Sequence, residues 1–72
     1  MAEMKSEALA AEIRAEVARQ RRTTTDLATE IGMSGAALGR RLRGEHPFDV
    51  TELEQIARAL GISVTDLWAR AS

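Results

Sequence analysis

The chain lacks cysteine and contains a single histidine, His46, among its 72 residues. The absence of cysteine excludes disulfides, thiolate metal sites and cysteine nucleophiles. One histidine cannot form a histidine-based metal cluster, and the sequence gives no reason to assign a Ser/His/Asp set around it. We therefore expect neither a metal nor any other cofactor, and we expect that the protein is not an enzyme.

Long apolar runs are missing as well. No stretch approaches the roughly 20 apolar residues that a membrane-spanning helix needs. The segment 1–10 carries charged residues and has no apolar core of a signal peptide. A chain of this length supports one domain, which we place at 1–72, with residues 1–8 as an N-terminal extension that frays. We expect a soluble protein of the cytoplasm without membrane contact.

The formal charge of −1 conceals an uneven distribution. Positions 19–43 contain six arginines and two acidic residues, which gives this segment a charge of +4. Residues 1–18 carry a charge of −2 and residues 44–72 a charge of −3. A basic middle between acidic ends suits a protein that binds a polyanion with one face. Solvated helix faces would give the same pattern, so charge alone does not decide between the two. The arginines are Arg19, Arg21, Arg22, Arg40, Arg41 and Arg43.

Helical signals recur along the chain, and no segment alternates with the period of a strand. Four residues with a side-chain oxygen can cap the start of a helix, and glycines follow three of the resulting segments. The pattern predicts an all-α fold, a compact five-helix bundle. The caps are Thr23, Ser34, Asp49 and Ser63, three of them with an acidic residue three positions later (Asp26, Glu52 and Asp66), and the glycines are Gly32, Gly44 and Gly61.

Apolar residues at helical spacing predict the core. The first helix, about Glu3 to Arg21, carries a stripe of apolar residues along one face. The third helix, Gly35 to about Arg43, must be stabilised by packing, because Gly35 and Gly39 each weaken it by about 1 kcal/mol. We expect Phe48 and Trp68 to be core anchors, with a dimer patch as the alternative for Trp68. The other core positions are Leu9, Ile13, Val17, Leu27, Ala28, Ile31, Leu38, Leu42, Val50, Leu53, Ile56, Ala57, Leu60, Val64 and Leu67.

The most informative stretch is Thr23 to Gly44. It contains two short helices that meet at Gly32 through a turn of three to four residues, which is the helix-turn-helix arrangement. Ala28 is small where the two helices cross closely, and Ile31 and Leu38 close the core between them. The helix-turn-helix unit is therefore placed at about 23–44.

The run TTTDLATEIGMSGAALGRRLRGEHPFDVTELEQIARALGISVTDLW resembles the helix-turn-helix domains of the phage lambda repressor and Cro type, particularly small members from actinobacteria and their phages. The resemblance extends from about Leu9 to Trp68. Its most specific parts are DLATEIGMS, the join RRLRGE-x-PF and LEQIARALGIS. It implies a five-helix bundle in which the second and third helices bind DNA, and it implies a homodimer on a palindromic operator.

The resemblance also implies which positions contact DNA. The base-reading positions are Gly35, Ala36, Ala37, Gly39 and Arg40. The phosphate-contacting positions that the resemblance implies are Thr24, Thr25, Arg43 and the loop that follows, which contains His46. The chemistry of their side chains adds Arg22, Ser34 and Arg41 as expected phosphate contacts. The chemistry agrees, because free amides at a helix N-terminus attract phosphate and an arginine can pair bidentately with guanine.

Three positions depart from the family pattern. Thr24 replaces a usual glutamine, Arg22 replaces an apolar residue, and Arg41 replaces a large apolar residue late in the third helix. That helix is also poor in side chains that form hydrogen bonds to bases, which leaves direct readout largely to Arg40. We therefore expect discrimination to depend also on DNA shape and on phosphate positioning.

The sequence thus predicts a nucleoid-associated transcriptional regulator that binds a specific double-stranded DNA sequence, of the repressor type found in phages and bacteria. It would act as a homodimer and without a small-molecule substrate. Two alternatives remain open. One is a protein-interaction module on a helix-turn-helix scaffold, such as an antitoxin. The other is an accessory factor in recombination or excision.

Overall fold

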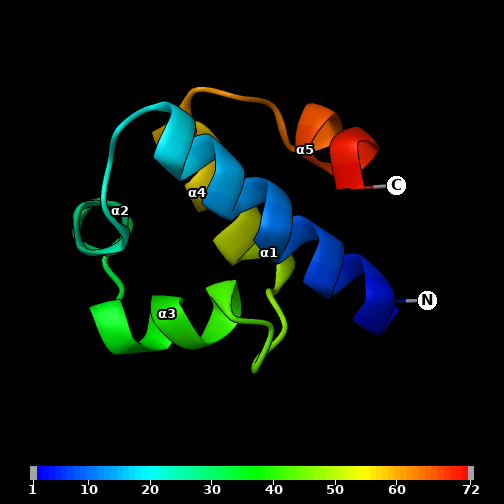
Figure 1. Ribbon diagram of the computed structural model, residues 1–72, viewed down its shortest axis with the longest axis horizontal. Helices are drawn as coiled ribbons and strands as arrows, with labels where there is room; N and C mark the ends of the chain where they lie inside the picture. The colour runs from blue at the N-terminus through cyan, green and yellow to red at the C-terminus, as the bar shows by residue number, and fades with distance from the viewer. Residues whose placement is uncertain (1, 72) are drawn as a thin grey trace.

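The computed structural model describes residues 2–71, with side chains described for residues 7–71, and this part of the chain contains five helices and no strand (Figure 1). The all-α prediction is confirmed. The prediction that residues 1–8 fray falls partly on Met1 and on the side chains of residues 2–6, which lie outside the described part. The helices are α1 (Ala2–Arg19), α2 (Thr24–Glu30), α3 (Gly35–Leu42), α4 (Val50–Leu60) and α5 (Val64–Ala71).

Helix α1 crosses the middle of the bundle and packs against α5 and α3 (Figure 1). Helix α2 packs against α3 and α4, and α4 packs against α5. Helix α3 forms the lower edge of the molecule in Figure 1, with no other helix beyond it. None of the described helices is both long and apolar enough to cross a membrane.

Each helix contributes one fully buried large side chain to a single core. Burial of one such residue stabilises the fold by about 1.5–3 kcal/mol, so all five helices depend on the same cluster. All five are among the core positions expected from the sequence. The five are Ile13, Leu27, Leu38, Ile56 and Leu67.

Two of the predicted core residues lie outside the core. Trp68 is 47% exposed and Val50 is 70% exposed, so the predictions that they are buried are wrong. Trp68 follows the fully buried Leu67, and consecutive helical residues point about 100° apart, which turns the indole away from the core. Val50 is the first residue of α4. Phe48, by contrast, is partly buried against the core, as predicted.

Helices α1 to α4 end in the same pattern of two backbone hydrogen bonds, which is the Schellman motif. This motif requires a left-handed residue just after the helix. Glycine takes that position after three helices, at Gly32, Gly44 and Gly61, with φ of 74°, 81° and 73°. After α1 the position is held by Arg21 with φ 58°. The left-handed turn at Arg21 explains why α1 ends at Arg19 and not at Arg21 as predicted.

We predict that Arg21→Gly stabilises the protein by up to about 1 kcal/mol, because glycine adopts the left-handed conformation without the steric cost that a side chain incurs. Chemical denaturation measures the change. Arg21→Ala is the matched control, since it removes the charge and keeps the strain. Equal stability of Arg21→Gly and Arg21→Ala would contradict the strain at this position.

Glu16 is a buried carboxylate on α1 that the sequence did not single out. It accepts a hydrogen bond from Gln20 Nε2 at 2.9 Å and lies 3.0 Å from Arg70 Nη1 of α5 and 3.2 Å from Arg19 Nη2. The hydrogen bonds from Gln20 and then Arg70 lower the pKa of Glu16, although burial opposes them. The carboxylate therefore links α1 to α5 in its charged form.

We predict that Glu16→Gln makes the protein less sensitive to acid. Because the folded state lowers the pKa of Glu16, the unfolded state binds more protons in acid, and this part of the stability is lost as the pH falls through the folded pKa. Urea denaturation at about pH 7 and about pH 3.5 measures the loss. Glu54→Gln, on an exposed side of α4, is the control. If Glu16→Gln loses as much stability between the two pH values as the wild type, the link between Glu16 protonation and stability is refuted.

Candidate nucleic-acid interface

Helices α2 and α3 and the turn between them form the predicted helix-turn-helix. The Thr23 hydroxyl caps α2 by accepting from the Asp26 amide at 3.0 Å, and the Ser34 hydroxyl caps α3 by accepting from the Ala37 amide at 3.1 Å. Gly32 takes the left-handed conformation in the turn, and a Cβ there would meet nothing within 4 Å. Local sequence therefore determines where both helices start and where α2 stops.

The first turns of α2 and α3 lie side by side. A Cβ built on Gly35 would lie 3.9 Å from Thr25 Oγ1, an ordinary van der Waals contact. Thr25, Gly35 and Ala36 are all exposed. The starts of the two helices therefore share one continuous exposed surface.

Helix α3 has one buried and one exposed face. Leu38 and Leu42 are buried, at 0% and 4% exposure, where α3 meets α1 and α2. At helical spacing, Ala36, Arg40 and Arg43 lie opposite these leucines, and Gly39 lies at their border. Gly39 is half-buried and the other three are exposed. We call these four residues the outer stripe.

Two arginines hold α3 in place. Arg14 of α1 donates a hydrogen bond from Nη1 to the carbonyl oxygen of Leu42 at the end of α3. Arg41 donates from Nε to Glu52 Oε1 of α4 at 3.0 Å and from Nη1 to the Ala37 carbonyl at 2.9 Å. Glu52 also accepts from the Asp49 amide at 3.1 Å, within the predicted capping box of α4. The position of α3 is thus fixed by its leucines and by polar contacts to α1 and α4.

The arginines predicted to contact phosphate are in different environments. Arg22 donates to the Ala59 carbonyl at 2.7 Å and also pairs with Glu30, so it ties the α1–α2 connection to α4 and α2. The side chain of Arg41 is only 13% exposed in its pair with Glu52. Arg43 is exposed and paired with Glu45 at 2.7 Å. Arg40 has no ion pair or hydrogen bond within the described side chains 7–71, so its guanidinium group needs no rearrangement to meet a ligand.

The remaining predicted contacts lie around the same two helices. Thr25 and His46 are exposed and Thr24 is half-buried. Ser34 is exposed, and its hydroxyl is already used as the cap of α3. The His46 Nδ1 atom lies 2.8 Å from the Pro47 carbonyl oxygen.

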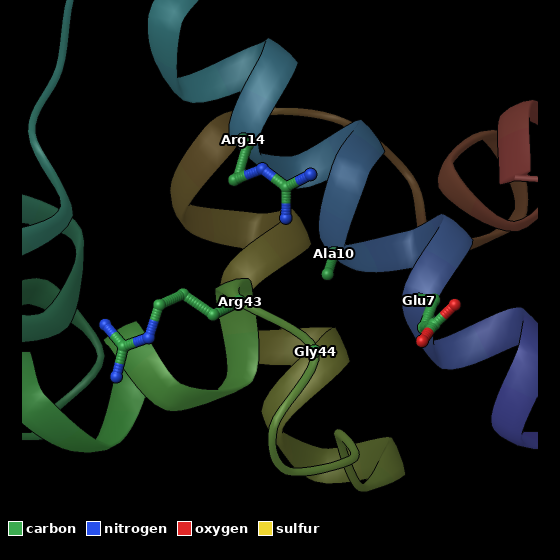
Figure 2. Close-up of a pocket in the computed structure, with 5 residues that line it drawn as sticks. All are labelled: Glu7, Ala10, Arg14, Arg43 and Gly44. Atoms are coloured by element: carbon green, nitrogen blue, oxygen red, sulfur yellow. The ribbon is translucent and has the colours of Figure 1, made fainter.

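Sequence reasoning missed Arg14 and Glu45. Together with α3, Arg14 borders a shallow hollow of about 220 Å³ between α1 and the end of α3 (Figure 2). Glu7, Ala10, Arg14, Arg43 and Gly44 line this hollow. Arg14 lies outside the helix-turn-helix motif, so only its place directly after the buried Ile13 could have indicated it. Glu45 could have been noticed as an acid two residues after Arg43.

The helix-turn-helix domain model matches residues 8–69, and the chain belongs to this family. Two crystal structures of the clp gene regulator ClgR from Corynebacterium glutamicum are similar to the chain, each at 31% identity and each covering 93% of it. Their TM-scores are 0.89 and 0.88, with 71% and 87% of the respective ClgR chain covered. No curated protein matches the chain significantly.

We predict that Arg41→Ala destabilises the protein by roughly 1–3 kcal/mol, because it leaves the partly buried Glu52 carboxylate without its cation. Arg40→Ala, the neighbouring control, should change stability by less than about 0.5 kcal/mol. A double-mutant cycle of Arg41→Ala with Glu52→Ala, measured by denaturation, isolates the pair. Additive effects of the two substitutions would show that the contact contributes nothing.

Proposed function

We propose that the chain, a DNA-binding transcriptional regulator of the helix-turn-helix family, recognises a specific double-stranded sequence by placing α3 in the major groove. One observation supports this most strongly: the outer stripe of α3 is continuous with the exposed start of α2, and its Arg40 guanidinium group forms no hydrogen bond or ion pair with the side chains described for residues 7–71.

The composition of the outer stripe suits close approach to base edges. Ala36 carries only a methyl group, so the first turn of α3 can enter deeply, and this methyl group can contact the methyl group of thymine. Arg40 then reads a guanine through its O6 and N7 atoms. Gly35 and Ala37 limit the bulk of the helix on either side of this stripe.

The proposed phosphate contacts are the hydroxyls of Thr24 and Thr25, with Ser34 and His46 at the border of the same surface. Contacts of this kind fix the position of the protein on the duplex without reading its sequence. Arg22 and Arg41 are weaker candidates, because each would have to give up the internal contacts described above.

A homodimer fits this mode of binding. Two copies of α3 would enter successive major grooves about 34 Å apart on a palindromic site. Bound across a promoter, such a dimer represses transcription by excluding the polymerase. Action on chromosomal DNA places the protein in the cytoplasm, with the nucleoid, and requires no catalysis.

A protein partner of the same surface is the competing proposal, and the few base-reading side chains on α3 favour it. This competing proposal includes an antitoxin-like protein. An excision or recombination factor, by contrast, would still bind DNA. Substitution of Arg40 and Arg43 together separates the two classes. Loss of DNA binding supports the regulator, whereas wild-type protein with no affinity for DNA supports a protein-binding module.

We predict that Arg40→Ala lowers affinity for the selected site by roughly 1–3 kcal/mol and relaxes preference at one guanine. Selection of bound sequences from a random duplex pool, followed by titration at several salt concentrations, measures both effects. Arg58→Ala on α4 removes an equal charge and serves as the control. Unchanged preference in Arg40→Ala, or affinity that is insensitive to salt, would overturn the proposed binding mode.

A further inference from the structure

The side chain of Arg43 does not extend away from the end of α3. It runs back along the helix, away from Arg14 and Glu7 (Figure 2). A Cβ built on Gly39 would lie 3.1 Å from Arg43 Nη1 and 3.9 Å from its Cζ. The guanidinium group of Arg43 therefore lies over Gly39, at the half-buried edge of the outer stripe.

Gly39 provides the space for this arrangement. A contact of 3.1 Å is tighter than a methyl group and a guanidinium nitrogen normally make, so any side chain at position 39 would push the Arg43 group outward. Glycine in this helix costs about 1 kcal/mol relative to alanine. The space that glycine leaves is occupied by the Arg43 guanidinium group.

Glu45 forms an ion pair with the guanidinium group of Arg43. Its Oε2 atom accepts from Arg43 Nε at 2.7 Å, and both side chains are more than half exposed. The same contact lowers the pKa of Glu45, so the carboxylate stays charged at neutral pH. Because the ion pair uses Nε, the two terminal nitrogens of Arg43 remain available as a fork of donors. This fork matches the O6 and N7 acceptors of guanine.

We propose that Arg43 is a specificity-determining residue, which reads a second guanine next to the one read by Arg40, and that Glu45 is the positioning residue that orients it. This proposal rests on the proposed binding of α3 in the major groove. It departs from the expectation that Arg43 contacts only phosphate. A lysine ammonium group can also bind a phosphate, whereas the reading of O6 and N7 together requires the oriented fork.

Arg43→Lys tests the distinction, because lysine keeps the charge and lacks the planar fork. Selection from a random duplex pool is repeated with this variant and compared with the wild type. We expect preference to be lost at one guanine, with affinity for the selected site lowered about tenfold or more and affinity for unrelated duplex within about twofold. Unchanged preference, or equal loss on both kinds of DNA, would overturn the role of Arg43.

Glu45→Gln tests the positioning role, with Glu54→Gln as the charge-matched control. Removal of an acid near DNA should raise affinity for unrelated duplex in any case. If Glu45 orients Arg43, the variant also loses preference at the guanine that Arg43→Lys loses, and at no other position. A uniform rise in affinity with every preference retained would reduce Glu45 to a repulsive charge and refute its positioning role. A wild-type protein that binds DNA but enriches no sequence would refute the proposed function itself.

Discussion

Burial of Leu38 and Leu42 is the constraint from which the properties of α3 follow. These two leucines fix the rotation of a short helix that contains two glycines, and rotation decides which residues meet solvent. With the leucines against α1 and α2, the opposite residues form the outer stripe. A rotation of one residue, about 100°, would remove Arg40 from that stripe and expose a leucine in its place.

Polar contacts, together with the two leucines, fix the position of α3 against its neighbours. Arg14 binds the last turn of α3 and Arg41 ties its side to Glu52 of α4, so α3 is held from both α1 and α4. In the same way, Gln20 and Arg22 donate to the carbonyls of Leu60 and Ala59 at the end of α4, at 2.7 Å in both cases. Several arginines of the basic middle segment thus bind helix ends and acids of the protein itself. The charge pattern alone overstates the number of cations available to DNA.

Local sequence determined much of the fold. The caps at Thr23, Ser34 and Asp49 and the left-handed glycines act within four or five residues, so their patterns can be recognised without any knowledge of the tertiary structure. Trp68 could not be placed in this way, because its exposure depends on the rotation of α5 against α1. The periodicity of an eight-residue helix does not fix that rotation within one position.

The candidate site shows the same limit. Sequence reasoning identified α3 and both Arg40 and Arg41, which are adjacent in the chain. It could not distinguish Arg40, which forms no ion pair within the described part of the chain, from Arg41, since the partner of Arg41 is eleven residues away on another helix. Nor could it find that Arg43 folds back over Gly39, because a side-chain conformation depends on neighbours that a sequence pattern does not specify.

The central claim is that the exposed surface of α2 and α3 binds duplex DNA. Amide chemical shifts followed by nuclear magnetic resonance, during titration with a selected duplex, test it most directly. The account predicts the largest changes in the first turn of α2, along the outer stripe of α3 and at Glu45. Changes centred on α5, or no saturable change with any duplex, would contradict it.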